Sequence, residues 1–198
     1  MSGKYRTIVA DPPWPYENPG GGPLSASPEH RPNSYDSPLN GSGSVKRYGA
    51  LSIEDLCALK PGAADDAHLY LWTTNAFLVA AHEIAEAWGF RQVTMLTWAK
   101  THQADAGRIS MKTGYYFRGA TEHCLFCVKG SLKLHTTDAL PTAYLWPRQP
   151  HSVKPDASYD LVERASPGPY CELFARRARF GWDYWGDESL GTAEMPVA

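Results

Sequence analysis

YRTIVADPPW, residues 5–14, joins a short apolar run to two consecutive prolines. The β-branched residues Thr7, Ile8 and Val9 predict a strand. The strand must end at Asp11, because two prolines cannot continue the hydrogen-bond ladder of a central strand. The motif Asp11-Pro12-Pro13-Trp14 is therefore expected directly after the C-terminal end of the first strand.

Strands and helices alternate along the rest of the chain. Strands are predicted over 67–72, 90–98, 122–128 and 170–174, and helices over 52–60, 75–88 and 155–165. In the 75–88 helix, Asn75 can cap the start, Phe77 and Ile84 share one face, and Gly89 suits a left-handed stop. This alternation predicts a single α/β domain over residues 1–198, with a mostly parallel sheet and helices on both faces.

Two long polar segments interrupt this pattern. Residues 15–50 are rich in Gly, Pro, Ser and Asn, and residues 101–118 form the second segment. Long loops inside a compact domain are commonly lids or binding loops. Ligands of open α/β sheets lie beyond the C-terminal ends of the strands, so we expect both loops to act there as a lid or as substrate contacts.

The composition excludes several classes of protein. The chain carries 19 Lys and Arg against 21 Asp and Glu, which is not the strongly basic profile of a nucleic-acid coat. Residues 101–181 carry 11 against 7, which permits a local basic groove. No apolar run approaches a membrane span, and no signal sequence follows Met1. We therefore expect a cytoplasmic protein without a membrane partner.

Cys124-x-x-Cys127 raises the question of a metal site. Both cysteines lie in a predicted strand, where a spacing of three places side chains on opposite faces. No second Cys-x-x-Cys or close histidine pair completes four ligands. We expect buried, reduced thiols and no metal.

The first motif suits a particular substrate group. The carboxylate of Asp11 and the carbonyl of Pro12, expected to be free, form a rigid pair of acceptors, because proline fixes φ and removes backbone donors. Trp14 adds a face for stacking. Two such acceptors suit a planar exocyclic amine such as N6 of adenine: they draw its lone pair out of conjugation and stabilise the positive charge that develops when nitrogen attacks a methyl group. An Asn or Gln amide would use the same acceptors, and a plain Asp-Pro turn is a further alternative.

The motif and the segments after it resemble the MT-A70 family of adenine-N6 methyltransferases. The shared segments run in family order over about residues 5–188: Tyr48-Gly49-x-x-Ser52, Leu69–Trp72, Trp98-Ala99-Lys100-Thr101, Glu122-His123-Cys124-Leu125, His151-Ser152-x-Lys154-Pro155-Asp156, Ser166-Pro167-Gly168 and Glu172-Leu173-Phe174-x-Arg176. The resemblance implies a Rossmann-like methyltransferase fold that uses S-adenosylmethionine. It also implies a permuted motif order, in which the catalytic motif precedes the strand that cradles the cofactor.

The resemblance also assigns roles to individual residues. The catalytic motif would be Asp11, Pro12, Pro13 and Trp14. The acceptor-base pocket would be lined by Trp14, Tyr48 and Glu122. The cofactor would be bound by Asp11, Lys154, Glu172, Phe174, Arg176, Gly186, Asp187 and Glu188. Arg177-Ala178-Arg179 departs from the Pro-His-Asn of the eukaryotic members, and these arginines either meet phosphate or form a solvated face.

These assignments predict methyl transfer to N6 of adenine in nucleic acid. We expect DNA, because the compact chain lacks the added domains of the messenger-RNA enzyme; RNA is the alternative. A non-catalytic nucleic-acid-binding partner of a methyltransferase is a third possibility, against which the intact Asp11-Pro12-Pro13-Trp14 and Lys154 argue. A homodimer or a helper subunit is compatible with so small a chain.

Overall fold

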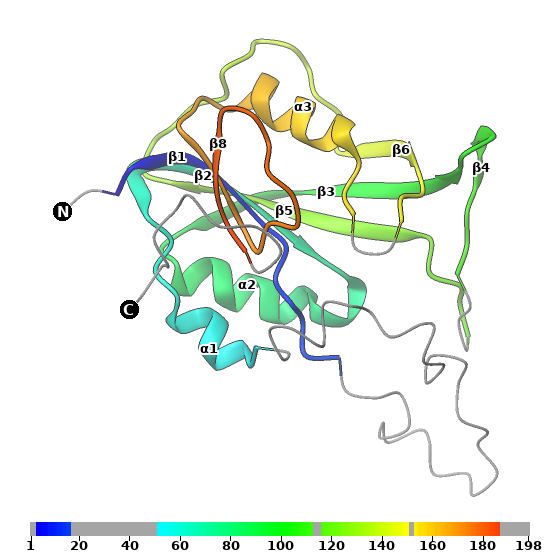
Figure 1. The fold of residues 1–198 in the computed structure, drawn as a ribbon, viewed down its shortest axis with the longest axis horizontal. Coiled ribbons are helices and arrows are strands. Elements are labelled where there is room, and N and C mark those ends of the chain that lie inside the picture. The colour runs from blue at the N-terminus through cyan, green and yellow to red at the C-terminus, as the bar shows by residue number, and fades with distance from the viewer. Residues whose placement is uncertain (1–2, 17–50, 113–115, 151–152, 187–198) are drawn as a thin grey trace, which may run out of the picture.

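The computed structural model describes residues 3–16, 51–112, 116–150 and 153–186. In chain order the elements are β1 (Tyr5–Ala10), α1 (Ile53–Ala58), β2 (Ala63–Thr73), the short 3-10 helix η2 (Asn75–Phe77), α2 (Leu78–Ala87), β3 (Arg91–His102), β4 (Asp105–Ile109), β5 (Thr121–Lys129), β6 (Ala143–Pro147), α3 (Asp156–Ala165), β7 (Tyr170–Leu173) and β8 (Trp182–Trp185) (Figure 1). The predictions for Tyr48, Asp187, Glu188 and most of the 15–50 segment lie outside the described residues.

The described strands form one mixed sheet in the order β4-β3-β5-β2-β1-β7-β8, with β6 paired to β3. Parallel ladders join β1 to β2, β1 to β7, β7 to β8 and β3 to β6. Antiparallel ladders join β5 to β2 and β3, and β4 to β3. The expectation of a mostly parallel sheet is therefore wrong in part. Parallel neighbours need a long crossover, usually a helix, and the described part of the chain between β3 and β5 contains only the β4 hairpin.

The reversal of β5 brings its start to a shared edge of the sheet. β1, β2, β3, β7 and β8 all run in one direction, so their C-terminal ends meet along that edge. Because β5 runs the opposite way between β2 and β3, its N-terminal end lies at the same edge. Residues that leave β1 and β3 and residues that enter β5 therefore come together.

Helices cover both faces of the sheet, as predicted, although they are few (Figure 1). On one face, Leu56 of α1 and Ile84 of α2 pack in a buried cluster that includes Ile8. On the other face, Tyr159 of α3 packs in a cluster that includes Val9. Successive residues of β1 thus serve opposite layers, as the alternation of a strand requires. Among the described helices, none has the length and apolar character needed to span a bilayer.

The cysteines follow the predicted alternation. Cys124 belongs to the buried cluster under α3, whereas Cys127 belongs to the cluster under α1 and α2. Their exposed fractions are 3% and 0%. Burial raises the pKa of the Cys127 thiol to about 12, so the thiol stays protonated at neutral pH.

Several local predictions are confirmed. β1 ends before the two prolines, and α1 lies within the helix predicted over 52–60. The helix begins with a capping box in which Ser52 and Asp55 satisfy each other's backbone. Gly89 follows α2 with φ of 81°, the left-handed stop that its sequence position suggests.

Other local predictions are wrong. The helix predicted over 75–88 is divided into η2 and α2, and Asn75 does not cap it: the N-cap residues Thr74 and Phe77 make no side-chain capping bond. Residues 101–118 do not form one loop, because β3 continues to His102 and β4 pairs with it as a hairpin. All five residues of β4 are exposed, so neither face of this strand needs apolar residues. Its sequence therefore lacks the alternation of polar and apolar residues by which a strand is recognised. The strands β6 and β8 are likewise absent from the sequence-based prediction.

Candidate active site

Asp11 stands one residue beyond the buried strand β1, at the edge where the strand ends meet. The prolines after it turn the chain tightly, and the backbone N–H of Trp14 donates to the carbonyl of Pro12 at 2.9 Å. The expectation that this carbonyl is free is therefore wrong. A carbonyl oxygen accepts two hydrogen bonds, so one acceptor position remains beside the Asp11 carboxylate.

Lys154 reaches Asp11 from a distant part of the chain. It precedes α3, whose N-cap residue is Pro155. The Nζ atom of Lys154 lies 2.5 Å from Oδ2 of Asp11 and 3.2 Å from Oε2 of Glu122. Its ammonium also sits 5.3 Å from the ring centroid of Trp72, and only 8% of the side chain is exposed. The lysine thus bridges two carboxylates that come from β1 and β5.

A second lysine holds the far side of Glu122. Lys100 lies near the C-terminal end of β3, and its Nζ atom pairs with Oε1 of Glu122. The ring of Trp98 lies beneath the same ammonium, with 4.6 Å between the nitrogen and the ring centroid. The side chains therefore form a row of alternating charge along the sheet edge: Asp11, Lys154, Glu122 and Lys100. We call this row the charged row.

The charged row keeps Glu122 and Lys154 ionised. Burial raises the pKa of Glu122, but the charges of Lys154 and Lys100 outweigh it, so the pKa is lowered overall. Burial lowers the pKa of Lys154, but the charges of Asp11 and Glu122 outweigh it, so the pKa is raised overall. Lys154 is therefore an ammonium at neutral pH and serves as a fixed positive charge, not as a base.

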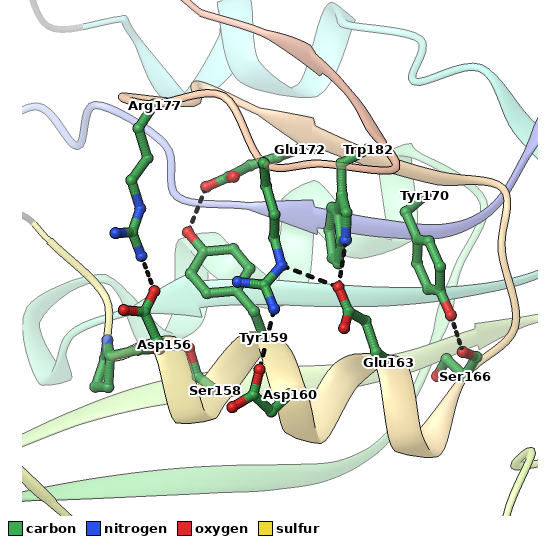
Figure 2. Close-up of polar contacts among 12 residues, drawn as sticks. Asp156, Ser158, Tyr159, Asp160, Glu163, Ser166, Tyr170, Glu172, Arg177 and Trp182 are labelled. Carbon is green, nitrogen blue, oxygen red and sulfur yellow. Dashed lines mark hydrogen bonds and ion pairs between the residues drawn. The ribbon is translucent and has the colours of Figure 1, made fainter.

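Glu172, one of the expected cofactor residues, is turned toward α3. The hydroxyl of Tyr159 donates to Oε1 of Glu172, and the donor and acceptor oxygens are 2.7 Å apart. Figure 2 shows the two side chains pointing toward each other. The glutamate is 7% exposed. Burial raises its pKa to about 7; the hydrogen bond from Tyr159 opposes this shift, and the charge of Asp11 adds to it. Glu172 is thus a buried carboxyl group whose charge changes near neutral pH.

The other expected cofactor residues lie beyond the ends of β7 and β8. Phe174 has φ of 64°, is buried and packs against Trp185, with 5.3 Å between the ring centroids. Arg176 follows in an intermediate state of burial. Gly186 lies against the backbone of Ala175, where a Cβ atom would come within 2.1 Å of the carbonyl oxygen. Glycine at 186 is therefore required by packing. No cofactor contact of these residues is tested, so their roles stay predictions.

Arg177 and Arg179 pair with acids of α3. Arg179 donates from Nε to Glu163 at 2.9 Å and from Nη2 to Asp160 at 3.0 Å. Arg177 pairs with Asp156 in the first turn of the same helix (Figure 2). These contacts tie the segment after β7 to the helix that begins two residues after Lys154.

Three aromatic residues near the motif have an arrangement that the sequence does not reveal. Trp14 is only 6% exposed and stacks on Phe77, with 5.1 Å between centroids and 16° between ring planes. Tyr16 is 59% exposed, meets Phe77 edge-on, and its hydroxyl lies 3.0 Å from Oγ1 of Thr74. Its place two residues after the motif is the one signal that could have drawn attention to Tyr16.

A polar network connects the segment that carries Phe77 to the strands β5 and β3. His123 lies next to Glu122 on β5, and its Nε2 atom is 2.7 Å from Oδ1 of Asn75. Its Nδ1 atom is 3.1 Å from Oγ1 of Thr97. Asn75 therefore links η2, which carries Phe77, to the start of β5.

Known proteins are similar in sequence to this chain. The MT-A70 family model matches residues 35–188. The chain is 30% identical over 193 residues to the type II methyltransferase M.MunI of a Mycoplasma species, covering 93% of this chain and 78% of that protein. It is 28% identical over 176 residues to the human N(6)-adenosine-methyltransferase catalytic subunit METTL3, covering 88% of this chain and 26% of that protein.

A plant relative gives the same picture. The chain is 28% identical over 193 residues to a putative MT-A70-like N(6)-adenosine-methyltransferase of Medicago truncatula. It spans about a quarter of the length of the plant and human relatives. The family implies a methyltransferase fold, built here on a mixed sheet with few helices. The chain belongs to the MT-A70 family of N6-adenine methyltransferases.

Proposed function

We propose that this chain transfers a methyl group from S-adenosylmethionine to N6 of adenine in DNA. The observation that carries the proposal is the position of Asp11 beyond β1, held by the buried ammonium of Lys154. A carboxylate fixed in this way is an acceptor that needs no reorganisation when charge develops on a substrate. Family membership supports both the reaction and the cofactor.

The charged groups of the site fit S-adenosylmethionine. The cofactor carries a carboxylate, an ammonium and a sulfonium. The site offers a buried cation, Lys154, and a carboxylate, Asp11, that are already paired with each other. Lys154 would bind the cofactor carboxylate, and Asp11 would face its positive groups. The adenosine end would be held by residues that follow β7 and β8: Arg176, Gly186, Asp187 and Glu188. The catalytic motif would then precede these cofactor-binding residues in the chain, which is the permuted motif order. When bound, the cofactor supplies an electrophilic methyl group on positively charged sulfur.

The protein groups act on the amine of the substrate. The carboxylate of Asp11 and the remaining acceptor position of the Pro12 carbonyl would each accept one N–H of the adenine amine. Both are fixed, Asp11 by Lys154 and the carbonyl by the N–H of Trp14. They would stabilise the positive charge on nitrogen during attack, and the proton can leave afterwards. Glu122 would line the base pocket beside them.

Two aromatic residues, Trp14 and Tyr16, are candidates for stacking on the adenine base. Trp14 is buried against Phe77, whereas the ring of Tyr16 is exposed next to the same residue. Base–aromatic stacking contributes about 1–3 kcal/mol, provided that the ring is accessible. We therefore assign the stacking contact to Tyr16 and a packing role to Trp14. Tyr48 and the 15–50 segment remain proposed substrate contacts.

DNA is supported as the substrate by the similarity to M.MunI, a type II methyltransferase, to which the chain is 30% identical over 193 residues. An adenine in duplex DNA must be flipped out of the stack, at a cost of a few kcal/mol. RNA is the second candidate, because METTL3 is an N(6)-adenosine-methyltransferase subunit. A homodimer or a helper subunit is compatible with the proposal.

The polymer is identified by direct product analysis. Purified protein is incubated with isotopically labelled S-adenosylmethionine and, separately, with duplex DNA, single-stranded DNA and RNA. Each polymer is digested to nucleosides and examined by mass spectrometry. Labelled N6-methyldeoxyadenosine is expected. Labelled N6-methyladenosine from RNA alone would replace DNA by RNA, and the absence of label from all three polymers would refute the proposed activity.

A further inference from the structure

A pocket of about 610 Å³ opens next to Glu122 and Lys100. It lies between the β3–β4 hairpin and the segment that follows β6. Its walls include Gln103 in the turn between β3 and β4, Lys112 shortly after β4, and Arg148 just after β6. One end of the charged row therefore forms the inner wall of an open pocket at the edge of the sheet. We call this pocket the hairpin pocket.

Two cations of the hairpin pocket have no acidic partner among the residues that the structure describes. The ion pairs of the charged row use Glu122 for Lys100 and Asp11 for Lys154. Within the described ranges, Lys112 and Arg148 form no ion pair, and both are exposed. The pocket thus carries positive charge beyond what its own carboxylate neutralises.

The electrostatic environment of Lys112 agrees with this excess. Partial desolvation lowers the pKa of Lys112, and the charge of Lys100 lowers it further. The carboxylate of Glu122 opposes these effects, while Arg148 and Lys154 add to them. Several cations therefore act on the same region, and an anion placed there would be attracted by all of them.

Main-chain hydrogen bonds hold these two cations in place. The N–H of Arg148 donates to the carbonyl of Thr101 at 2.9 Å, and the Gln103 side chain donates to the carbonyl of Arg148 at 2.7 Å. In the segment after β4, the N–H of Lys112 donates to the carbonyl of Gly119 at 2.8 Å. The backbone of Arg148 is therefore tied to β3, which carries Lys100, and the backbone of Lys112 is tied to the segment that leads into β5, which carries Glu122.

We infer that the hairpin pocket binds backbone phosphates of the nucleic acid beside the target adenine, through Lys112 and Arg148. This inference rests on the proposed function and adds to it the surface that receives the strand. A phosphodiester is the anion that always accompanies a base, and Lys and Arg are its usual partners. Phosphate contacts position the strand without reading its sequence, so the pocket would fix the adenine near Asp11.

The experiment measures the salt dependence of nucleic-acid binding in the whole chain without cofactor. Fluorescence anisotropy gives Kd for a labelled mixed-sequence DNA duplex and for the matching single strand over a series of salt concentrations. The variants are Lys112→Ala, Arg148→Ala and the double variant. The slope of log association constant against log salt concentration is negative. For each phosphate that a variant no longer neutralises, this slope should become less steep by about 0.9 on a duplex and about 0.7 on a single strand.

Matched controls remove cations from the opposite edge of the sheet. Arg91→Ala lies at the start of β3, and Lys133→Ala follows β5; both residues are exposed. Their slopes should equal that of the wild type. Lys112→Arg keeps the charge and should keep the slope. Calorimetry with S-adenosylmethionine should give an unchanged Kd for Lys112→Ala and Arg148→Ala, because the inferred contact is to the strand.

The outcomes separate the inference from the proposed function. Unchanged slopes in the double variant would overturn the inference even if adenine is methylated. A higher Kd for S-adenosylmethionine with an unchanged salt dependence of DNA binding would also overturn the inference. It would assign the pocket to the cofactor carboxylate. Reduced slopes would support it even if no methyl group is transferred, since binding is measured without turnover. If the Arg91→Ala and Lys133→Ala controls reduce the salt dependence of DNA binding as much as Lys112→Ala and Arg148→Ala do, the effect is one of overall charge. That result would also overturn the inference.

Discussion

The Nζ atom of Lys154 lies 2.5 Å from Oδ2 of Asp11, although 143 positions separate the two residues. This ion pair joins the loop after the first strand to the start of α3. The same lysine contacts Glu122 at 3.2 Å, so a single buried cation organises two carboxylates from different strands. The geometry of the site therefore depends on how the sheet and α3 are placed relative to each other.

Replacing Lys154 with alanine should weaken the binding of S-adenosylmethionine. Hydrogen bonds to charged groups contribute about 1.5–3 kcal/mol, so Kd should rise by roughly ten- to a hundredfold in calorimetry. The matched control is Lys4→Ala, which removes an exposed lysine that pairs with Asp183. An unchanged Kd in Lys154→Ala would contradict the role assigned to this lysine.

Glu172 should make the stability of the protein depend on pH. Its pKa is raised from 4.5 to about 7, mainly by burial, so the folded state binds the proton more tightly than the unfolded chain. The stabilisation is complete below about pH 4.5 and is lost as the pH rises through about 7. Since one pKa unit corresponds to about 1.4 kcal/mol, the loss should approach about 3 kcal/mol.

Urea unfolding at about pH 5 and about pH 8 measures this loss. The variant Glu172→Gln keeps a hydrogen-bond acceptor for Tyr159 but cannot ionise, so it should lose less stability than the wild type between the two pH values. Glu83→Gln, an exposed change on α2, should follow the wild type. Parallel pH profiles of Glu172→Gln and wild type would show that Glu172 does not titrate in this range.

Substitutions at the two aromatic residues of the loop should have different effects. Tyr16→Ala should weaken nucleic-acid binding by an amount that corresponds to one stacking contact, about 1–3 kcal/mol, without a large loss of stability. Trp14→Ala should instead lower the free energy of unfolding by about 3–5 kcal/mol, because removal of the buried indole leaves a cavity.

Anisotropy titrations and urea unfolding distinguish these effects at Tyr16 and Trp14. Tyr16→Phe is the control: it keeps the ring but loses the hydroxyl contact to Thr74. It should retain most of the binding. A stable Trp14→Ala protein with weak nucleic-acid binding would return the stacking role to Trp14.

Arg179 should stabilise the contact between α3 and the segment after β7. It pairs with Glu163 and Asp160, and its guanidinium lies 5.0 Å from the ring centroid of Tyr159. These partly exposed contacts together suggest a loss of about 1–2 kcal/mol in Arg179→Ala. Arg164→Ala removes an exposed pair with Asp138 and should cost about 0.5 kcal/mol or less. Equal melting temperatures of the two variants would contradict this account.

The sequence predicts the local elements best where a strong local signal exists. The apolar run before the two prolines defines β1, and the capping box at Ser52 marks the start of α1. The prolines also place Asp11 beyond a strand end, where ligands of open sheets bind. That part of the site follows from the chemistry of a few adjacent residues.

The contacts of Lys154 and Glu122 could not be predicted from local sequence. They depend on the insertion of β5 between β2 and β3 in the reverse direction, a property of the whole sheet. The resemblance to the family points to Lys154 and Glu122 but does not give their pairing. The contact between Tyr159 and Glu172 is equally hard to predict, because it depends on how α3 packs against the sheet.

The most direct test of the account is the behaviour of Asp11→Ala with labelled S-adenosylmethionine and adenine-containing DNA. Calorimetry first establishes that the variant still binds the cofactor, and mass spectrometry then measures labelled N6-methyladenine. Asp138→Ala, an exposed acid, serves as the control and should be as active as the wild type. The account predicts cofactor binding without methyl transfer in Asp11→Ala; turnover at the wild-type rate would contradict it.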